Sequence, residues 1–100
     1  MKIKNINGSS KVSQKAPWPY SCWRDYWAGV VGFTFEDNKY YKCPSCGKPV
    51  LKENFDGCHV KKTSIFDNKW YIIPLCDSCN HITGEIEIDE RLLVEVPSNL

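Results

Sequence analysis

Two cysteine pairs of identical spacing constrain this chain more than any other feature of its 100 residues. Cys43 and Cys46 form the first pair and Cys76 and Cys79 form the second, each with two residues between the sulfurs. A two-residue gap lets one tight turn present both sulfurs to a single tetrahedral ion. Cysteines that only pack as small apolar side chains would not be expected in two matched pairs beside turn-forming residues. The pattern therefore predicts one structural metal site.

Zinc is the metal that this ligand set favours, because four thiolates in tetrahedral geometry suit it. Iron is the alternative, since the turn Cys43-Pro44-Ser45-Cys46-Gly47 resembles one of the metal-binding turns of rubredoxin. The second pair departs from that pattern, because Asn80 follows it where rubredoxin has glycine. A structural zinc site contributes on the order of 10 kcal/mol of apparent binding free energy. Folding is therefore expected to depend on the metal.

The composition is that of a small globular domain. A hydrophobic content of 42%, with 13% aromatic residues, can build one modest core, so we expect a single zinc-binding domain over residues 1–100. No stretch approaches the roughly 18 consecutive apolar residues of a membrane helix, and the first residues lack an apolar signal core. We therefore expect a cytoplasmic protein with no membrane partner. In a reducing cytoplasm the thiols stay available for metal.

Charge is distributed unevenly along the sequence. Residues 1–35 carry five Lys or Arg side chains against one acid, whereas residues 70–100 carry six acids against Arg91 alone. Four thiolates and one Zn²⁺ add two negative charges, so the formal net charge of +1 becomes about −1 in the metal-loaded chain. A strongly basic nucleic-acid binder is therefore excluded, although a local patch can still attract phosphate. Its candidate members are Lys2, Lys4, Lys11, Lys15 and Arg24.

The front of the chain combines a polar segment with an aromatic one. Residues 1–17 are polar and lack sustained periodicity, which predicts a flexible tail. Ser21 is placed to cap a short helix that Gly29 and Gly32 limit to about two or three turns. One face of this helix carries Trp23, Tyr26, Trp27 and Val30. We expect the stripe to pack over the metal subdomain; a platform on which a ligand stacks is the alternative.

The rest of the chain is predicted to be mainly β-structure. Strands are expected at 39–42, 57–62, 70–75, 85–89 and 92–96. A turn is expected at Asp67-Asn68, and a short helical turn over 76–83. The fold class predicted is therefore α+β, with β-hairpins and a short N-terminal aromatic helix.

The order of these motifs resembles a treble-clef zinc finger of the HNH endonuclease type. The resemblance covers residues 40–84 and is carried by Cys43-x-x-Cys46, Gly57-Cys58-His59-Val60 and Ile73-Pro74-Leu75-Cys76-x-x-Cys79-Asn80. It implies a small treble-clef domain in which the two cysteine pairs join a hairpin to a helix around zinc. A looser likeness, to small uncharacterised bacterial and phage four-cysteine zinc proteins, spans nearly the whole chain. That likeness implies no activity.

The HNH resemblance also implies candidate catalytic residues. His59 matches the histidine that activates water beside a catalytic divalent ion, and Asn80, with His81 next to it, matches the family's last His or Asn. Mg²⁺ would be the hard cation of such a site. Two positions depart from the family: Cys58 replaces the acid often found before the histidine, and Tyr71 replaces the central Asn.

Two functions are compatible with these observations. The leading hypothesis is a non-catalytic, structural-zinc-dependent binding module that contacts nucleic acid or protein, because the departures weaken a nuclease site. In it, His59 is a structural residue bonded to backbone or packed beside the zinc site. The alternative is an HNH-like metal-dependent nuclease with His59 as general base. Cys22 and Cys58 are left over, and we expect both to be buried free thiols; a second metal site or a reactive thiolate beside His59 is the alternative for Cys58.

Overall fold

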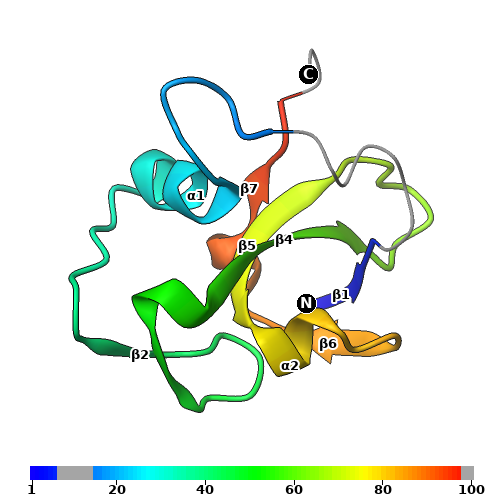
Figure 1. Ribbon diagram of the computed structural model, residues 1–100. Coiled ribbons are helices and arrows are strands. Elements are labelled where there is room, and N and C mark those ends of the chain that lie inside the picture. The colour runs from blue at the N-terminus through cyan, green and yellow to red at the C-terminus, as the bar shows by residue number, and fades with distance from the viewer. Residues whose placement is uncertain (7–14, 98–100) are drawn as a thin grey trace.

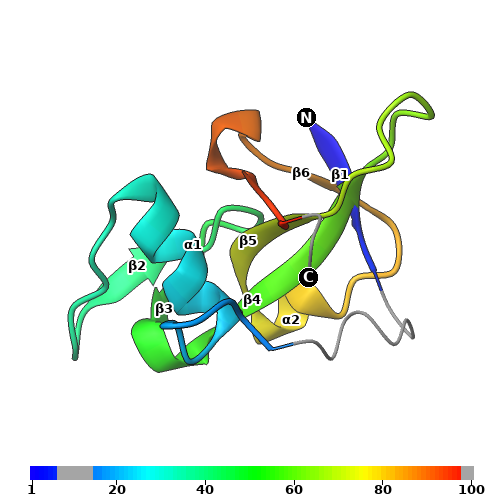
Figure 2. The same cartoon turned by 90° about the horizontal axis from the view of Figure 1, so that it is seen from above.

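A five-stranded antiparallel sheet forms the centre of the molecule, as the computed structural model shows for residues 1–6 and 15–97 (Figure 1). Its strand order is β6-β1-β4-β5-β7. In chain order these strands are β1 (Lys2–Asn5), β4 (Phe55–Lys62), β5 (Tyr71–Cys76), β6 (Glu85–Glu87) and β7 (Val94–Glu95). A second sheet pairs β2 (Tyr40–Lys42) with β3 (Pro49–Leu51). Figure 2 shows this small sheet at the opposite end of the molecule from β1 and β6.

Among the residues that the structure describes, four short helical segments complete the α+β fold. They are α1 (Trp23–Val31), α2 (Asp77–Asn80) and two 3-10 turns at Lys52–Asn54 and Glu90–Leu92. The predicted strands at 85–89 and 92–96 are shorter than expected and lie at opposite edges of the sheet, because β6 pairs with β1 while β7 pairs with β5. In the described part of the chain, no helix has the length and apolar character required to cross a membrane.

Helix α1 lies across one face of β4 and β5. Trp23 and Trp27 are buried with Ile72 of β5, as the predicted aromatic stripe requires. Val30 was expected on the same stripe but is 55% exposed, because the helix turns its last residues toward solvent. The predicted cap is also wrong by one residue: the helix begins after Cys22, which makes no side-chain capping bond. The helix ends at Gly32, whose φ of 75° suits glycine.

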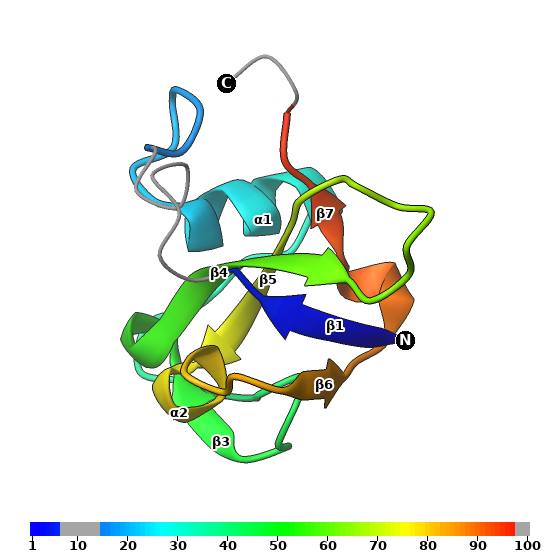
Figure 3. The same cartoon turned by 90° about the vertical axis from the view of Figure 1, so that its right-hand side faces the viewer.

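The predicted flexible tail is wrong for the first described residues. Lys2–Asn5 is an inner strand, hydrogen-bonded to β4 on one side and β6 on the other (Figure 3). Ile3 is fully buried in the main core, and the Asn5 amide donates to the carbonyl oxygens of Cys79 and Ile82 at 3.0 Å. The buried Ile3 side chain and the hydrogen bonds of Asn5 thus hold this mostly polar segment in the sheet. Residues 7–14 of the predicted tail lie outside the described residues.

The fold places basic residues from the start of the chain beside acidic residues from its end. In the register of β1 and β6, Lys2 lies opposite Glu87 and Lys4 lies opposite Glu85. The amino terminus also forms an ion pair with Glu87. Arg24 forms an ion pair with Asp25 at 3.1 Å. Most described members of the predicted basic patch therefore have an acidic neighbour.

Candidate metal centre

The first cysteine pair occupies the turn between β2 and β3. The Cys43 amide donates to the Lys48 carbonyl, and the Gly47 amide donates to the Cys43 carbonyl, both at 2.9 Å. Gly47 has a φ of 74°, a left-handed conformation that glycine adopts without strain. This turn reverses the chain just after Cys46 and holds the pair at one end of the small sheet.

The second pair joins the end of β5 to the start of α2. Cys76 is the last residue of the strand and precedes the helix, and Cys79 lies within the helix. The Asn5 amide bond to the Cys79 carbonyl fixes this short helix against β1. The second pair is thus held by the central sheet, while the first belongs to the small one.

The four sulfurs meet in one cluster, with all Sγ atoms within 4.8 Å of one another. The Cys46 and Cys76 sulfurs are 3.8 Å apart. A tetrahedral zinc ion with Zn–S bonds of about 2.3 Å places adjacent sulfurs about 3.8 Å apart. The Cys76 amide donates to the Cys43 sulfur at 3.5 Å, as amides around metal thiolates do. The four cysteines are therefore arranged to hold one metal ion, and their geometry fits Zn²⁺.

The thiols of this cluster do not all ionise readily by themselves. Burial raises the pKa of Cys43. Hydrogen bonds from the backbone amides of Cys46, Cys76 and Ser45 lower it by more, so the pKa is about 7. Burial, helped by neighbouring thiols, raises the pKa of Cys79 to about 12. Because a metal binds thiolates, loading the site must release protons, and its affinity must fall in acid.

The predicted general base, His59, lies under helix α1. His59 is only 6% exposed, and the centroid of its ring lies 4.9 Å from that of Trp23 and 6.1 Å from that of Trp70. Burial lowers the pKa of His59, so the ring is neutral at pH 7. Its Nε2 is buried and, within the described chain, has no hydrogen-bond partner.

The other two predicted catalytic residues lie elsewhere. The Asn80 amide donates to the Asp56 carboxylate at 3.2 Å. The His81 side chain is 71% exposed, with Nδ1 2.7 Å from the carbonyl oxygen of Asp77. Among the contacts of the described residues, none joins the His59 ring to Asn80 or His81. The structure instead brings Asn80 to Asp56, a carboxylate that sequence reasoning missed although it lies three residues before His59.

The two leftover cysteines differ in environment. Cys58 is 2% exposed, and burial strongly raises its pKa. Its thiol donates to the Asp56 carbonyl at 3.4 Å. Cys58 is therefore a buried, unreactive thiol, as predicted. Cys22 is also a free thiol, but it is only half-buried, so the prediction that it is buried is wrong.

Comparison with known proteins gives no match for this chain. No protein-family model matches it, and neither the curated proteins nor the solved structures contain a match. The structure itself shows a small, mostly antiparallel α+β domain with short helices and a four-cysteine cluster suited to one metal ion.

Proposed function

We propose that this chain is a non-catalytic binding module whose structure depends on one zinc ion. The observation that carries the proposal is the meeting of four sulfurs from two distant segments within 4.8 Å. Along the chain, the first cysteine pair lies in a turn, the β4–β5 hairpin follows, and the second pair lies at the start of helix α2. We assign this order to a treble-clef finger of the HNH-like type. The short α2 supplies one ligand and its preceding residue supplies another.

The partner of this module is a protein or a nucleic acid. The surroundings of two lysines favour a protein. Lys2 and Lys4, candidates for phosphate contacts, lie opposite Glu87 and Glu85 in the sheet. A carboxylate beside each ammonium reduces the local attraction for phosphate.

A metal-dependent HNH-like nuclease is the second candidate. The pairing of Asn80 with Asp56 favours it, because amide and carboxylate oxygens are ligands that Mg²⁺ accepts. A general base, however, must come within hydrogen-bond reach of the water that it deprotonates. The His59 ring is enclosed by Trp23 and Trp70 and lacks that access. We therefore assign His59 a packing role and place the nuclease second.

Native mass spectrometry of the purified chain tests the zinc assignment. We expect one zinc ion per chain and a colourless protein, whereas iron in the same site would give visible thiolate-to-iron absorption. A Mg²⁺ or Mn²⁺ titration of the zinc-loaded protein, followed at the His59 ring by NMR, should leave that ring unmoved.

A cleavage assay separates the two functions. We expect no cleavage of DNA or RNA in Mg²⁺ or Mn²⁺. Cleavage that disappears in a His59→Ala variant still able to bind zinc would replace the binding module with the nuclease. An Asn80→Ala variant with the same loss would place the divalent ion beside Asp56.

A further inference from the structure

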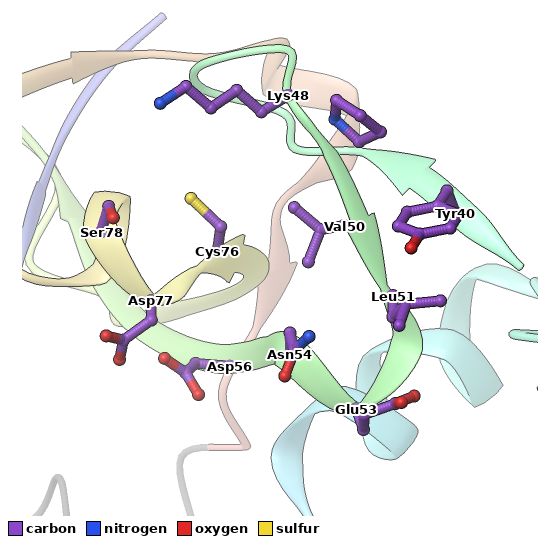
Figure 4. Close-up of a pocket in the computed structure, with 11 residues that line it drawn as sticks. Tyr40, Lys48, Val50, Leu51, Glu53, Asn54, Asp56, Cys76, Asp77 and Ser78 are labelled. Atoms are coloured by element: carbon purple, nitrogen blue, oxygen red, sulfur yellow. The ribbon is translucent and has the colours of Figure 1, made fainter. Parts of the chain in front are cut away.

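A groove of about 600 Å³ runs between β3 and the start of α2, directly beside the metal centre (Figure 4). Cys76, one of the four clustered cysteines, lies on its wall. One side is largely apolar and is formed by Val50 and Leu51 of β3 together with Tyr40 of β2. Tyr40 is 66% exposed, so an apolar surface is open to solvent here. The groove therefore offers contact area for aliphatic groups.

The same groove is surrounded by negative charge. Glu53, Asp56 and Asp77 line it, whereas Lys48 is the one cation among its lining residues. Figure 4 shows Lys48 at the other end of the groove from Asp56 and Asp77. Four thiolates with one Zn²⁺ would add two negative charges at the wall that Cys76 forms. The groove is thus strongly anionic once the metal is bound.

These carboxylates have little compensation inside the protein. Asp56 accepts a hydrogen bond from the neutral Asn80 amide. Asp77 lies 3.6 Å from His81, which is a cation only when protonated. Among the described residues, neither Asp56 nor Glu53 has a salt bridge. Lys15 and Arg24 line the neighbouring hollow that Asp56 and Asp77 also line, but within the described chain neither cation forms a salt bridge with them, so these carboxylates keep their charge for a ligand.

Strand β3 adds a backbone feature to this groove. It pairs with β2 through Pro49, Val50 and Leu51, and the small sheet has only these two strands in the described chain. The edge of β3 away from β2 has no strand partner among the described residues; Pro49 on this edge carries no N–H, so the main-chain groups of the edge are the Pro49 carbonyl and the N–H and carbonyl of Leu51. An extended peptide can add to such an edge through main-chain hydrogen bonds, while its side chains enter adjacent pockets.

We propose that this groove binds an extended segment of a partner protein that carries an Arg or Lys side chain. The aliphatic stem of that side chain lies on Val50 and Leu51, and its charged head meets Asp56 and Asp77. The peptide backbone runs along the open edge of β3. The inference rests on the proposed function, since the zinc ion fixes the wall on which Cys76 lies.

A nucleic acid is a poorer occupant of this groove. Phosphates would face three carboxylates and the metal-thiolate cluster, which repel them. Elsewhere, Lys62 is already engaged by Glu90 at 2.9 Å and Asp67 at 3.6 Å. The charge distribution therefore favours a cationic peptide.

Selection from a library of random linear peptides displayed on phage, against the zinc-loaded full chain, tests the proposal. We expect enriched peptides to carry an excess of Arg and Lys. Their affinity, measured by fluorescence anisotropy, should fall roughly tenfold in an Asp56→Asn/Asp77→Asn double variant, which removes the two carboxylates assigned to the charged head. A Glu85→Gln/Glu95→Gln variant loses the same charge away from the groove and should bind within about threefold of the parent.

The outcomes separate this inference from the proposed function. Enrichment of acidic or neutral peptides, no enrichment, or equal loss of affinity in both double variants would overturn the cationic-peptide site, with the zinc module intact. Binding of a random-sequence single-stranded oligonucleotide that competes with the peptides would assign the groove to nucleic acid instead. Absence of bound zinc in the parent would overturn the proposed function itself.

Discussion

Gly57 shows at the scale of one residue why this chain needs glycine within a central strand. A Cβ atom built at Gly57 would lie 2.4 Å from the backbone nitrogen of Arg24 and 2.7 Å from the carbonyl carbon of Trp23. Both atoms belong to the backbone at the start of α1, so they cannot move aside as a flexible side chain would. The helix therefore packs against the strand at a separation that only glycine permits.

A Gly57→Ala variant is predicted to lose stability. Moving helix and strand apart should cost about 1–3 kcal/mol of unfolding free energy, which urea unfolding of the zinc-loaded protein measures. Gly84→Ala is the matched control, because its Cβ would meet nothing within 4 Å. Equal unfolding midpoints for the two variants would contradict the close approach.

His59 should make the stability depend on pH. Burial lowers the pKa of its ring in the folded state below the usual value of 6.5. Between these two values the unfolded chain binds more protons, so acid favours unfolding. The contribution of neutral His59 is therefore complete above about pH 6.5 and is lost as the pH falls below it.

A His59→Leu variant measures this contribution. We expect its stability to fall less between pH 7.5 and pH 5.5 than that of the parent, by at most about 1.4 kcal/mol per pH unit for one proton. Metal release in acid affects both proteins alike, so the comparison isolates the imidazole. Parallel pH profiles would show that His59 titrates normally and is accessible to solvent.

Single residues differ in how far the sequence could identify them. The four clustered cysteines were predictable because a two-residue spacing can be recognised in the sequence alone and places both sulfurs of a pair on one side of a turn, whatever the rest of the fold. A structural role for His59 was predicted, but its neighbours were not, because Trp23 and Trp70 come from different segments of the chain. Asp56 was missed for the same reason: its partner Asn80 lies 24 residues away.

At the scale of elements, β1 is the strand that composition predicted least well. The sequence Lys-Ile-Lys-Asn is mostly polar, yet it forms an inner strand whose single apolar side chain is fully buried. A strand of four residues gives too few alternations to be recognised alone. Strands β4 and β5, which are longer and of which β5 is apolar throughout, were located within one or two residues of the prediction.

An Ile3→Ala variant tests whether β1 belongs to the folded core. The loss of a fully buried isoleucine should lower the unfolding free energy by about 2–5 kcal/mol. Ile65→Ala removes the same atoms from a side chain that is 83% exposed and should have little effect. If the two variants unfolded at the same urea concentration, β1 would be a tail in solution.

At the scale of the whole molecule, long-range pairing decides where charge lies. The basic start and acidic end of the chain form adjacent strands, β1 and β6, a pairing across more than 80 residues that periodicity could not reveal. The result is a sheet region of mixed charge and a separate anionic groove beside the metal centre. The distribution of charge thus depends on the fold more than on composition.

The metal centre joins the two sheets, so its loss should affect the entire molecule. Cys43 and Cys46 lie in the turn that joins the two strands of the small sheet, while Cys76 ends a strand of the central sheet and Cys79 lies in α2. Metal binding of on the order of 10 kcal/mol is comparable to the whole stability of a small domain. A Cys79→Ser variant, or a strong chelator, is therefore predicted to unfold the protein.

Circular dichroism with metal analysis checks this prediction. Cys22→Ser is the matched control, because Cys22 lies outside the four-cysteine cluster; it should keep one zinc ion and the parent spectrum. Adding zinc back to the chelated parent should restore the spectrum, whereas Cys79→Ser should not respond. If the chelated protein kept its spectrum after zinc was shown to be gone, the central sheet would fold by its apolar core alone, and the ion would only position the small sheet beside α2.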